Sequence, residues 1–163
     1  MSEPQRQSDL AESLALGRPA VAGRGGPLSS RLAAFRKKRK VLTMHQGSCH
    51  CGAVRLTLPS TPESATSCNC SLCRRIGGPW VYFEWGTVTI EAAPDATQAY
   101  VQGDRTLRTI RCRHCGCVTH WEPISAEAGA RHGVHLGNFD PKLIASVRVR
   151  RFDGANTWRF LDE

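Results

Sequence analysis

Alternating apolar and polar positions mark a series of short segments in the part of the chain that follows residue 44. Residues 53–58, Ala-Val-Arg-Leu-Thr-Leu, alternate in this way and end at Pro59, which predicts a half-buried strand. Similar short runs bounded by turn residues predict further strands over residues 80–84, 87–91, 98–102, 106–111, 118–121, 132–136 and 157–161. Strands at such near-regular spacing predict a mainly β domain, built as an all-β sheet or a barrel-like fold.

Two of the connections between these strands predict tight hairpins. One is Trp85-Gly86, between the strands predicted to end at residue 84 and to begin at residue 87, and the other lies around Gly103-Asp104. Both pairs of neighbouring strands are therefore expected to be hydrogen-bonded to each other.

A single stretch, residues 140–146, predicts a helical turn. Asp140 is a good N-cap because its side chain can accept a hydrogen bond from a free backbone N–H, and Pro141 suits the first helical position. Helix is therefore expected to be a minor component of the domain.

The composition predicts a thin hydrophobic core. The 163 residues suffice for one domain with a modest core, and 40% are hydrophobic and 7% aromatic. Bound metal is therefore expected to carry part of the folding free energy, since structural zinc contributes roughly 10–16 kcal/mol in small domains.

The net charge of +8 comes mainly from the N-terminal segment. Residues 1–43 hold nine Lys/Arg against three acidic residues, whereas residues 44–163 hold thirteen against eleven. The run Arg-Lys-Lys-Arg-Lys at residues 36–40 indicates either a contact with nucleic acid or a membrane surface, or a solvated extension. We expect residues 1–43 to be a basic, disordered extension of the single domain 44–163. A native start at Met44 is an alternative.

The eight cysteines indicate metal binding rather than a disulfide framework. The chain shows no basic region followed by an uninterrupted apolar one, as a secretory signal would have, and no stretch approaches the ~18 apolar residues of a membrane span. We therefore expect a cytoplasmic protein without a membrane partner. In that compartment closely spaced cysteine pairs point to metal or redox chemistry.

Two cysteine pairs predict a closed structural zinc site. Cys49 and Cys51 precede the first strand, and Cys112 and Cys115 follow the strand predicted to end at residue 111. Four thiolates complete the coordination of a structural zinc ion, and Gly116 supplies the backbone freedom that a tight metal-binding turn needs. This site would join parts of the chain about sixty residues apart.

A second cluster predicts a zinc site that is open to solvent or substrate. Cys68, Cys70 and Cys73 lie within six residues, and no fourth ligand follows in the neighbouring sequence. A site with three protein ligands leaves a coordination position open, where an incoming thiol can be held as thiolate. An iron–sulfur cluster is a competing interpretation. The site would instead be closed, and structural, if one of the distant candidates supplied a fourth ligand: Cys117, His114, His120, His132 or His135.

These motifs resemble those of a known enzyme family. The three segments that carry the resemblance are Gly-Ser-Cys-His-Cys-Gly-Ala-Val-Arg at residues 47–55, Cys-Asn-Cys-Ser-Leu-Cys-Arg-Arg at 68–75 and Cys-Arg-His-Cys-Gly at 112–116. They are similar to the signature blocks of the glutathione-dependent formaldehyde-activating enzymes, a family that includes the vertebrate centromere protein V. The resemblance covers roughly residues 45–163.

The resemblance implies a fold, a reaction and two metal ions. The fold is an Mss4-like, β-tent zinc-binding fold, and the activity is that of a carbon–sulfur lyase, which adds glutathione or another small thiol to a small aldehyde. It implies a structural zinc on Cys49, Cys51, Cys112 and Cys115, and a catalytic zinc on Cys68, Cys70 and Cys73.

Beside the predicted catalytic zinc, Arg74 and Arg75 are candidates for binding the glutathione carboxylates through charge-assisted hydrogen bonds. The role of His135 is left open, and Cys117 is interpreted as a packed or spare thiol.

Two other classes of function compete with the enzyme. One is a zinc-stapled binding module in which both ions are structural. The other is a protein that binds nucleic acid or an anionic surface through residues 36–40, which we expect less because such basic segments are common.

Overall fold

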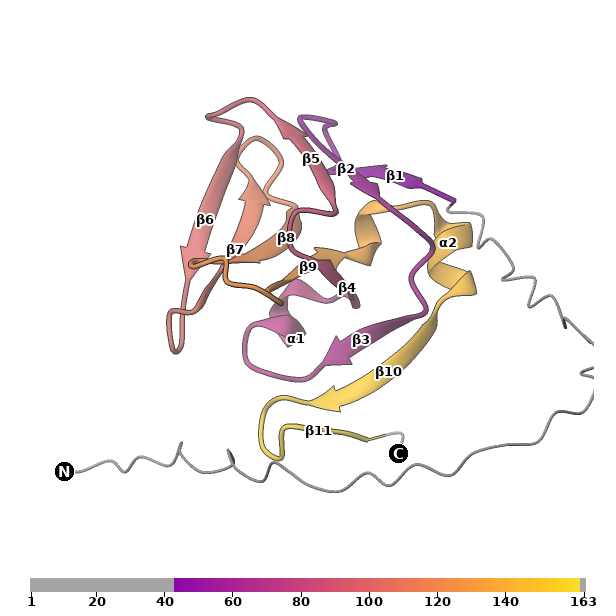
Figure 1. Ribbon diagram of the computed structural model, residues 1–163, viewed down its shortest axis with the longest axis vertical. Helices are drawn as coiled ribbons and strands as arrows, with labels where there is room; N and C mark the ends of the chain where they lie inside the picture. The colour runs from indigo at the N-terminus through magenta and orange to yellow at the C-terminus, as the bar shows by residue number, and fades with distance from the viewer. Residues whose placement is uncertain (1–42, 162–163) are drawn as a thin grey trace, which may run out of the picture. The chain divides into compact units, whose positions relative to one another are not determined.

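The computed structural model describes residues 43–161, which form a mainly β domain (Figure 1). The strands are β1 His45–Ser48, β2 Val54–Leu58, β3 Ser64–Cys68, β4 Trp80–Glu84, β5 Thr89–Ala92, β6 Thr97–Val101, β7 Leu107–Cys112, β8 Val118–Pro123, β9 Arg131–His135, β10 Arg148–Asp153 and β11 Arg159–Phe160. The helical segments are α1 Cys73–Ile76, the 3-10 turn η1 Leu136–Asn138 and α2 Pro141–Ser146. Two sheets result, a three-stranded one in the order β1-β2-β5 and an eight-stranded one in the order β11-β10-β3-β4-β9-β8-β7-β6.

The small sheet is antiparallel and centred on β2. This strand pairs with β1 on one side and with β5 on the other. Val54, Leu56 and Leu58 are buried on one of its faces, while Arg55 is exposed on the other, as the alternating sequence predicts. The small sheet therefore presents one apolar face to the rest of the domain.

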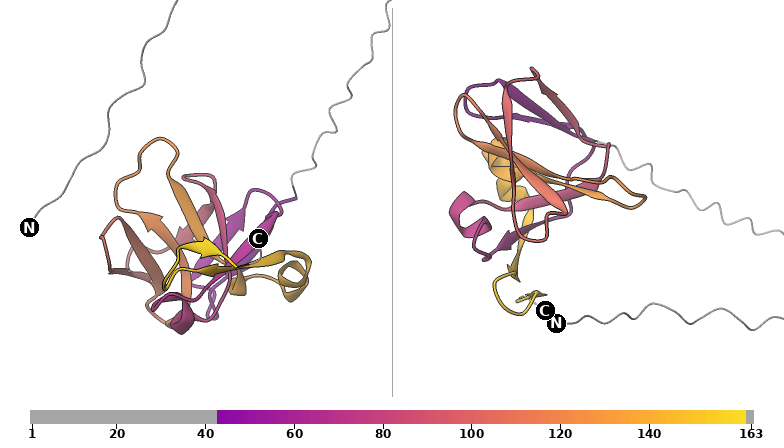
Figure 2. Two further views of the ribbon diagram at one scale, coloured as in Figure 1. Left: turned by 90° about the horizontal axis from the view of Figure 1, so that it is seen from below. Right: turned by 90° about the vertical axis from the view of Figure 1, so that its left-hand side faces the viewer.

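The large sheet is an antiparallel meander extended by a short parallel addition. Strands β6, β7, β8, β9 and β4 pair in that order, each antiparallel to its neighbour. Strand β3 joins β4 through the pair Thr66 and Trp80, and β10 then lies parallel to β3. In Figure 1, β3, β10 and β11 lie at the bottom and the small sheet lies at the top. The β8–β9 hairpin, drawn in orange, projects from the sheet in Figure 2.

The core lies where the two sheets and α2 meet. Leu56 of β2, Val81 of β4, Val134 of β9 and Leu136 of η1 are at most 1% exposed and belong to one apolar cluster, which Leu143 of α2 completes. The side chains of this core are mostly aliphatic and of moderate size.

The hairpin around Gly103-Asp104 and the helical turn are confirmed. Strands β6 and β7 pair antiparallel across that turn. The Asp140 carboxylate accepts a hydrogen bond from the backbone N–H of Lys142 at 2.7 Å, and Pro141 is the first residue of α2. Both features depend on local backbone preferences, which is why the sequence alone predicts them.

The predicted hairpin across Trp85-Gly86 is wrong. The turn exists, since the N–H of Thr87 donates to the carbonyl of Glu84 at 3.2 Å, but it directs the chain from one sheet to the other. Strand β4 pairs with β9 and β3, whereas β5 pairs with β2. The reason is that β4 and β2 lie in the interiors of different sheets: β4 lies between β3 and β9, and β2 lies between β1 and β5.

The sequence patterns do not predict strands β1, β3 and β10 or helix α1. Strand β3, Ser-Ala-Thr-Ser-Cys, has no large apolar side chain, and β10 contains several arginines. Strand β1 and helix α1 have only four residues each. The last predicted strand, over residues 157–161, shortens to β11.

The described residues include no helix that is long and apolar enough to cross a membrane. The predicted basic extension, with its run at residues 36–40, lies outside the described residues apart from Thr43.

We predict that Leu56→Ala lowers the free energy of unfolding by roughly 2–5 kcal/mol, because it removes a side chain that is 1% exposed from the contact between the sheets. Equilibrium urea unfolding, with zinc held constant, measures this loss. The matched control is Ile124→Ala, since Ile124 is 50% exposed and should change stability by no more than about 0.5 kcal/mol. Equal losses in the two variants would contradict the proposed core.

Candidate functional site

Four cysteines from two distant turns converge on one point. Cys49 and Cys51 follow β1, Cys112 ends β7 and Cys115 lies in the turn after it. The Cys51 sulfur is 3.6 Å from that of Cys49 and 3.7 Å from that of Cys112, and all four sulfurs lie within 4.8 Å of one another. Four sulfurs bound to one tetrahedral zinc at ~2.3 Å would be about 3.8 Å apart. The group can therefore hold a metal ion, and its geometry fits zinc.

The backbone shapes this four-cysteine group and ties it to both sheets. Gly116 has a φ of +76°, which favours glycine, and its N–H donates to the carbonyl of Cys112 at 3.0 Å. On the other side, the N–H of Val54 donates to the Cys49 sulfur at 3.3 Å. Because Cys49 belongs to the small sheet's hairpin and Cys112 to the large sheet, the group joins the two sheets.

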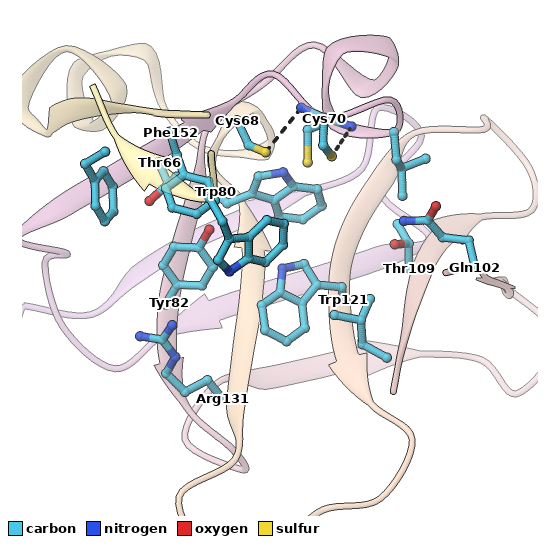
Figure 3. Close-up of a pocket in the computed structure, with 15 residues that line it drawn as sticks. Thr66, Cys68, Cys70, Trp80, Tyr82, Gln102, Thr109, Trp121, Arg131 and Phe152 are labelled. Atoms are coloured by element: carbon cyan, nitrogen blue, oxygen red, sulfur yellow. Dashed lines mark hydrogen bonds between the residues drawn. The ribbon is translucent and has the colours of Figure 1, made fainter. Parts of the chain in front are cut away.

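Cys68, Cys70 and Cys73 form the second group, with sulfurs within 4.8 Å of one another. Cys68 ends β3, and Cys73 begins α1. The backbone N–H of Cys70 donates to the Cys68 sulfur at 3.4 Å, and the N–H of Cys73 donates to the Cys70 sulfur at 3.4 Å (Figure 3). Over residues 43–161 no further cysteine, histidine or carboxylate joins this group. It can hold a metal ion while leaving a position free.

Two of the candidate fourth ligands, His120 and His132, do not join the three cysteines. They group with Glu122 instead. Side chains alternate between the faces of a strand, so His120 and Glu122 of β8 point away from the side occupied by Trp121.

The remaining candidate fourth ligands, His135, His114 and Cys117, do not join the three-cysteine group either. His135 packs its ring edge-on against Trp80, with the ring centres 5.3 Å apart, and covers the backbone at Gly78. His114 is exposed in the turn of the four-cysteine group. Cys117 adjoins that group, where its carbonyl accepts from the N–H of Cys112 at 2.8 Å, and its thiol is free.

A hydrogen-bonded latch fixes the loop between Cys68 and Cys73. The Asn69 amide donates to Asp153 Oδ1 at 2.7 Å and accepts from the N–H of Ala155 at 2.9 Å. Hydrogen bonds from Asn69 and Thr157 lower the pKa of Asp153 to about 2, so the carboxylate stays ionised at neutral pH. The loop is thus tied to the end of β10, more than eighty residues away in sequence.

The three-cysteine group opens on an aromatic cavity of about 520 Å³. Figure 3 shows Cys68 and Cys70 at one end of it, Trp80, Tyr82 and Trp121 along its walls, and Arg131 towards the other end. The lining residues are Thr66, Cys68, Cys70, Leu72, Cys73, Trp80, Tyr82, Gln102, Leu107, Thr109, Trp121, Arg131, Phe152, Trp158 and Phe160. The cavity thus combines a metal-binding end with mostly apolar walls.

The three thiols differ in how readily they ionise. Burial raises the pKa of Cys68 and of Cys73. Burial also acts to raise the pKa of Cys70, but hydrogen bonds from the backbone of Cys73 outweigh it and lower the pKa. Three thiolates this close together repel one another, so binding of a cation is what allows all three to lose their protons.

The two arginines predicted to bind substrate lie outside the cavity lining. Arg74 and Arg75 are exposed on α1, and the Arg75 guanidinium donates to the carbonyl of Ser71 at 2.5 Å. Their role in binding carboxylates stays a prediction. The cation that does line the cavity is Arg131, whose guanidinium lies 5.0 Å from the centre of the Tyr82 ring.

Sequence reasoning missed most of the cavity wall. Trp80, Tyr82 and Trp121 read as ordinary strand residues, and β10 and β11, which supply Phe152 and Phe160, were not predicted as parts of the site. The alternation along β4 and β8 contained the one available signal, since it predicts which side chains share a face. It does not reveal which face adjoins the cysteines.

Comparison with known proteins agrees with this architecture. Residues 44–152 match the model of the family described as glutathione-dependent formaldehyde-activating enzyme. A crystal structure of a Rhodobacter sphaeroides protein, determined as a structural genomics target, is similar with a TM-score of 0.53 and 28% sequence identity; the match covers 64% of this chain and 98% of that chain. The expected mainly β fold class is confirmed.

We predict that Asn69→Ala weakens metal binding at Cys68, Cys70 and Cys73 by about 10–100-fold, the usual cost of losing a hydrogen-bonded support of a metal site. The four-cysteine group should keep its ion. Zinc release to a chromogenic chelator, followed over time, separates the two sites as a fast and a slow phase.

The matched control for this prediction is Asn156→Ala, because the Asn156 amide donates to the same Asp153 oxygen at 3.4 Å but Asn156 lies outside the loop between Cys68 and Cys73. Faster release in both variants, or in neither, would show that Asn69 does not support the site.

Proposed function

The chain belongs to the glutathione-dependent formaldehyde-activating enzyme family, and on that premise we propose that it is a zinc-dependent carbon–sulfur lyase. It joins a small thiol of the glutathione type to an aldehyde, or cleaves the resulting hemithioacetal. The zinc that serves this reaction is held by Cys68, Cys70 and Cys73, while Cys49, Cys51, Cys112 and Cys115 hold a structural zinc.

One observation carries this proposal: the three-cysteine group lacks a fourth ligand among residues 43–161 and faces a cavity. A purely structural zinc site is closed by four protein ligands, whereas catalytic sites keep a position for water or substrate. The second group is therefore built as an open site, and the first as a closed one.

The reaction is a balanced addition. The sulfur of the thiol forms a bond to the aldehyde carbon, the π electrons of the carbonyl move to its oxygen, and the proton lost by the sulfur ends on that oxygen. A zinc ion held by the three cysteines would supply positive charge, which would favour the thiolate at neutral pH although a free thiol has a pKa near 8.5.

The chain's own residues orient the reactants. Tyr82 lines the cavity, and burial raises its pKa, so its hydroxyl keeps its proton and can donate a hydrogen bond to the aldehyde oxygen. Trp80 and Trp121 exclude water from the walls. We expect the protein to act in the cytoplasm, because cysteines stay reduced there and available to bind metal.

We expect zinc content to respond to thiol at one site only. Wild-type protein purified under reducing conditions should carry two zinc ions per chain, falling towards one as glutathione is added, because an incoming thiol competes at the open site. Cys70→Ala should carry one zinc ion, remain folded and lose the addition of glutathione to formaldehyde. Elemental analysis and an assay of adduct formation measure the two effects.

The matched control for this experiment is Cys117→Ala, which removes a thiol that belongs to neither group. It should keep both ions and the activity. Full activity in Cys70→Ala would overturn the proposal. Two zinc ions indifferent to glutathione would favour the alternative, a binding module with two structural ions.

The apolar walls predict a preference for aldehydes with an apolar body. Trp121→Ala should raise the KM for benzaldehyde about 10-fold, since contact with one aromatic wall contributes about 1.5 kcal/mol, and should leave the KM for formaldehyde unchanged. Steady-state kinetics with glutathione held saturating measure both constants. Tyr100→Ala is the control, because Tyr100 is 55% exposed and does not line the cavity. Equal changes for the two aldehydes would contradict a role of this wall in selection.

A further inference from the structure

A third group of metal-ligating side chains lies on the face of the large sheet opposite the cavity. It consists of His120 and Glu122 of β8 and His132 of β9, whose nearest ligand atoms all lie within 4.8 Å of one another. His120 and His132 are 4% and 3% exposed. Two imidazoles and a carboxylate with so little exposure to solvent need an explanation, because buried polar groups almost always have hydrogen-bond partners.

The Thr119 hydroxyl links His120 to the backbone. It hydrogen-bonds the carbonyl of Ile110 at 3.2 Å and His120 Nδ1 at 2.9 Å. Because Nδ1 has this partner, Nε2 is the nitrogen of His120 that is left to face the rest of the group.

That nitrogen lies near a carboxylate oxygen. His120 Nε2 is 3.8 Å from Glu122 Oε2, beyond hydrogen-bond distance, whereas the other carboxylate oxygen, Oε1, accepts from Arg108 Nε at 2.6 Å. A cation between Nε2 and Oε2 would bind both atoms.

His132 is the third potential ligand of the group. Neither of its ring nitrogens has a hydrogen-bond partner among the described residues, although both are buried. Its ring lies edge-on to that of His120, with centres 5.3 Å apart, and Trp85 covers it at 4.9 Å. An unpartnered imidazole in this position has a lone pair to offer and is shielded from water.

We propose that His120, Glu122 and His132 bind a third metal ion, a divalent ion of the zinc class. Imidazole with carboxylate suits zinc and its neighbours in the first transition series, whereas magnesium and calcium prefer oxygen ligands alone. Ligands of a tetrahedral ion at about 2.1 Å are roughly 3.4 Å apart. Separations of at most 4.8 Å therefore need only side-chain rotation to close.

Two neighbours orient this His120–Glu122–His132 site. Thr119 hydrogen-bonds His120 Nδ1, and Arg108 holds Glu122 by one oxygen, Oε1. Such supporting partners are usual around metal ligands. The charge of Arg108 opposes a cation only weakly, because its side chain is 47% exposed and solvent screens it.

The position of the site suggests what the ion does. Strands β8 and β9 are registered through two pairs, His120 with Val134 and Trp121 with Gly133. Glu122 and His132 lie one position beyond the last of these pairs, where the projecting β8–β9 hairpin begins (Figure 2). An ion there would hold the two strands together and stabilise the sheet that carries the cavity on its other face.

Zinc and cobalt titrations of the full chain test this proposal. Wild-type protein with both cysteine groups loaded should take up one more zinc ion per chain and gain in melting temperature. Added cobalt should give ligand-field absorption without the thiolate-to-cobalt charge-transfer band that a cysteine site produces. His132→Phe, which keeps a ring against Trp85, should weaken this uptake at least 100-fold, and so should Glu122→Gln.

His45→Phe is the control, since His45 hydrogen-bonds Thr61 outside this group, and it should bind the additional ion like wild type. Glu122→Gln, whose parent side chain is 15% exposed, serves if His132→Phe fails to fold. A wild-type chain that takes up no additional ion would overturn the proposal, and so would uptake unchanged in both variants. Neither result bears on the cysteine sites, whose ions are counted separately by their charge-transfer bands.

Discussion

The four-cysteine group is the constraint on which the rest of the domain depends. It joins the turn after β1 in the small sheet to the turn after β7 in the large sheet, and Cys49 and Cys112 are almost fully buried there. The apolar core behind it is mostly aliphatic. A zinc ion at this point would contribute on the order of 10 kcal/mol to folding, which is comparable to the net stability of a whole domain.

The aromatic residues serve the cavity more than the core. The chain has four tryptophans, two tyrosines and five phenylalanines, and the cavity is lined by Trp80, Tyr82, Trp121, Phe152, Trp158 and Phe160. A small protein that places its largest apolar side chains around an open cavity needs another source of stability, and metal ions at the two cysteine groups would supply it. The two faces of the large sheet differ in what they carry: the cavity lies on one face, and His120, Glu122 and His132 lie on the other.

Local patterns predicted the parts of the fold that depend on neighbouring residues. The hairpin at Gly103-Asp104 and the capped start of α2 follow from turn and capping preferences, and both are present. The predicted hairpin at Trp85-Gly86 was wrong because a turn does not decide which strands pair. Strand β4 pairs with β9 and not with the next strand in the chain. Strand β3 was not predicted because its buried side chains, Ala65 and Thr66, are small, so that its sequence shows no alternation of large apolar residues; it pairs with β4 and β10.

The sequence alone indicated the cysteine pairs, the three-cysteine cluster and the family, because thiols separated by one or two residues can reach a shared metal ion with little help from the rest of the fold and because the same segments carry the family's motifs. That the two pairs meet in one group is decided by the fold, since they lie about sixty residues apart. Only the tertiary structure decided what surrounds the second group: the latch from Asn69 to Asp153, the aromatic walls, and the place of Arg131 in the cavity instead of Arg74 and Arg75. It also separated His120 and His132 from the cysteines by placing them across the sheet. These arrangements bring together residues from distant strands, and the order of strands in a sheet is set by the burial of whole faces, which no short stretch of sequence contains.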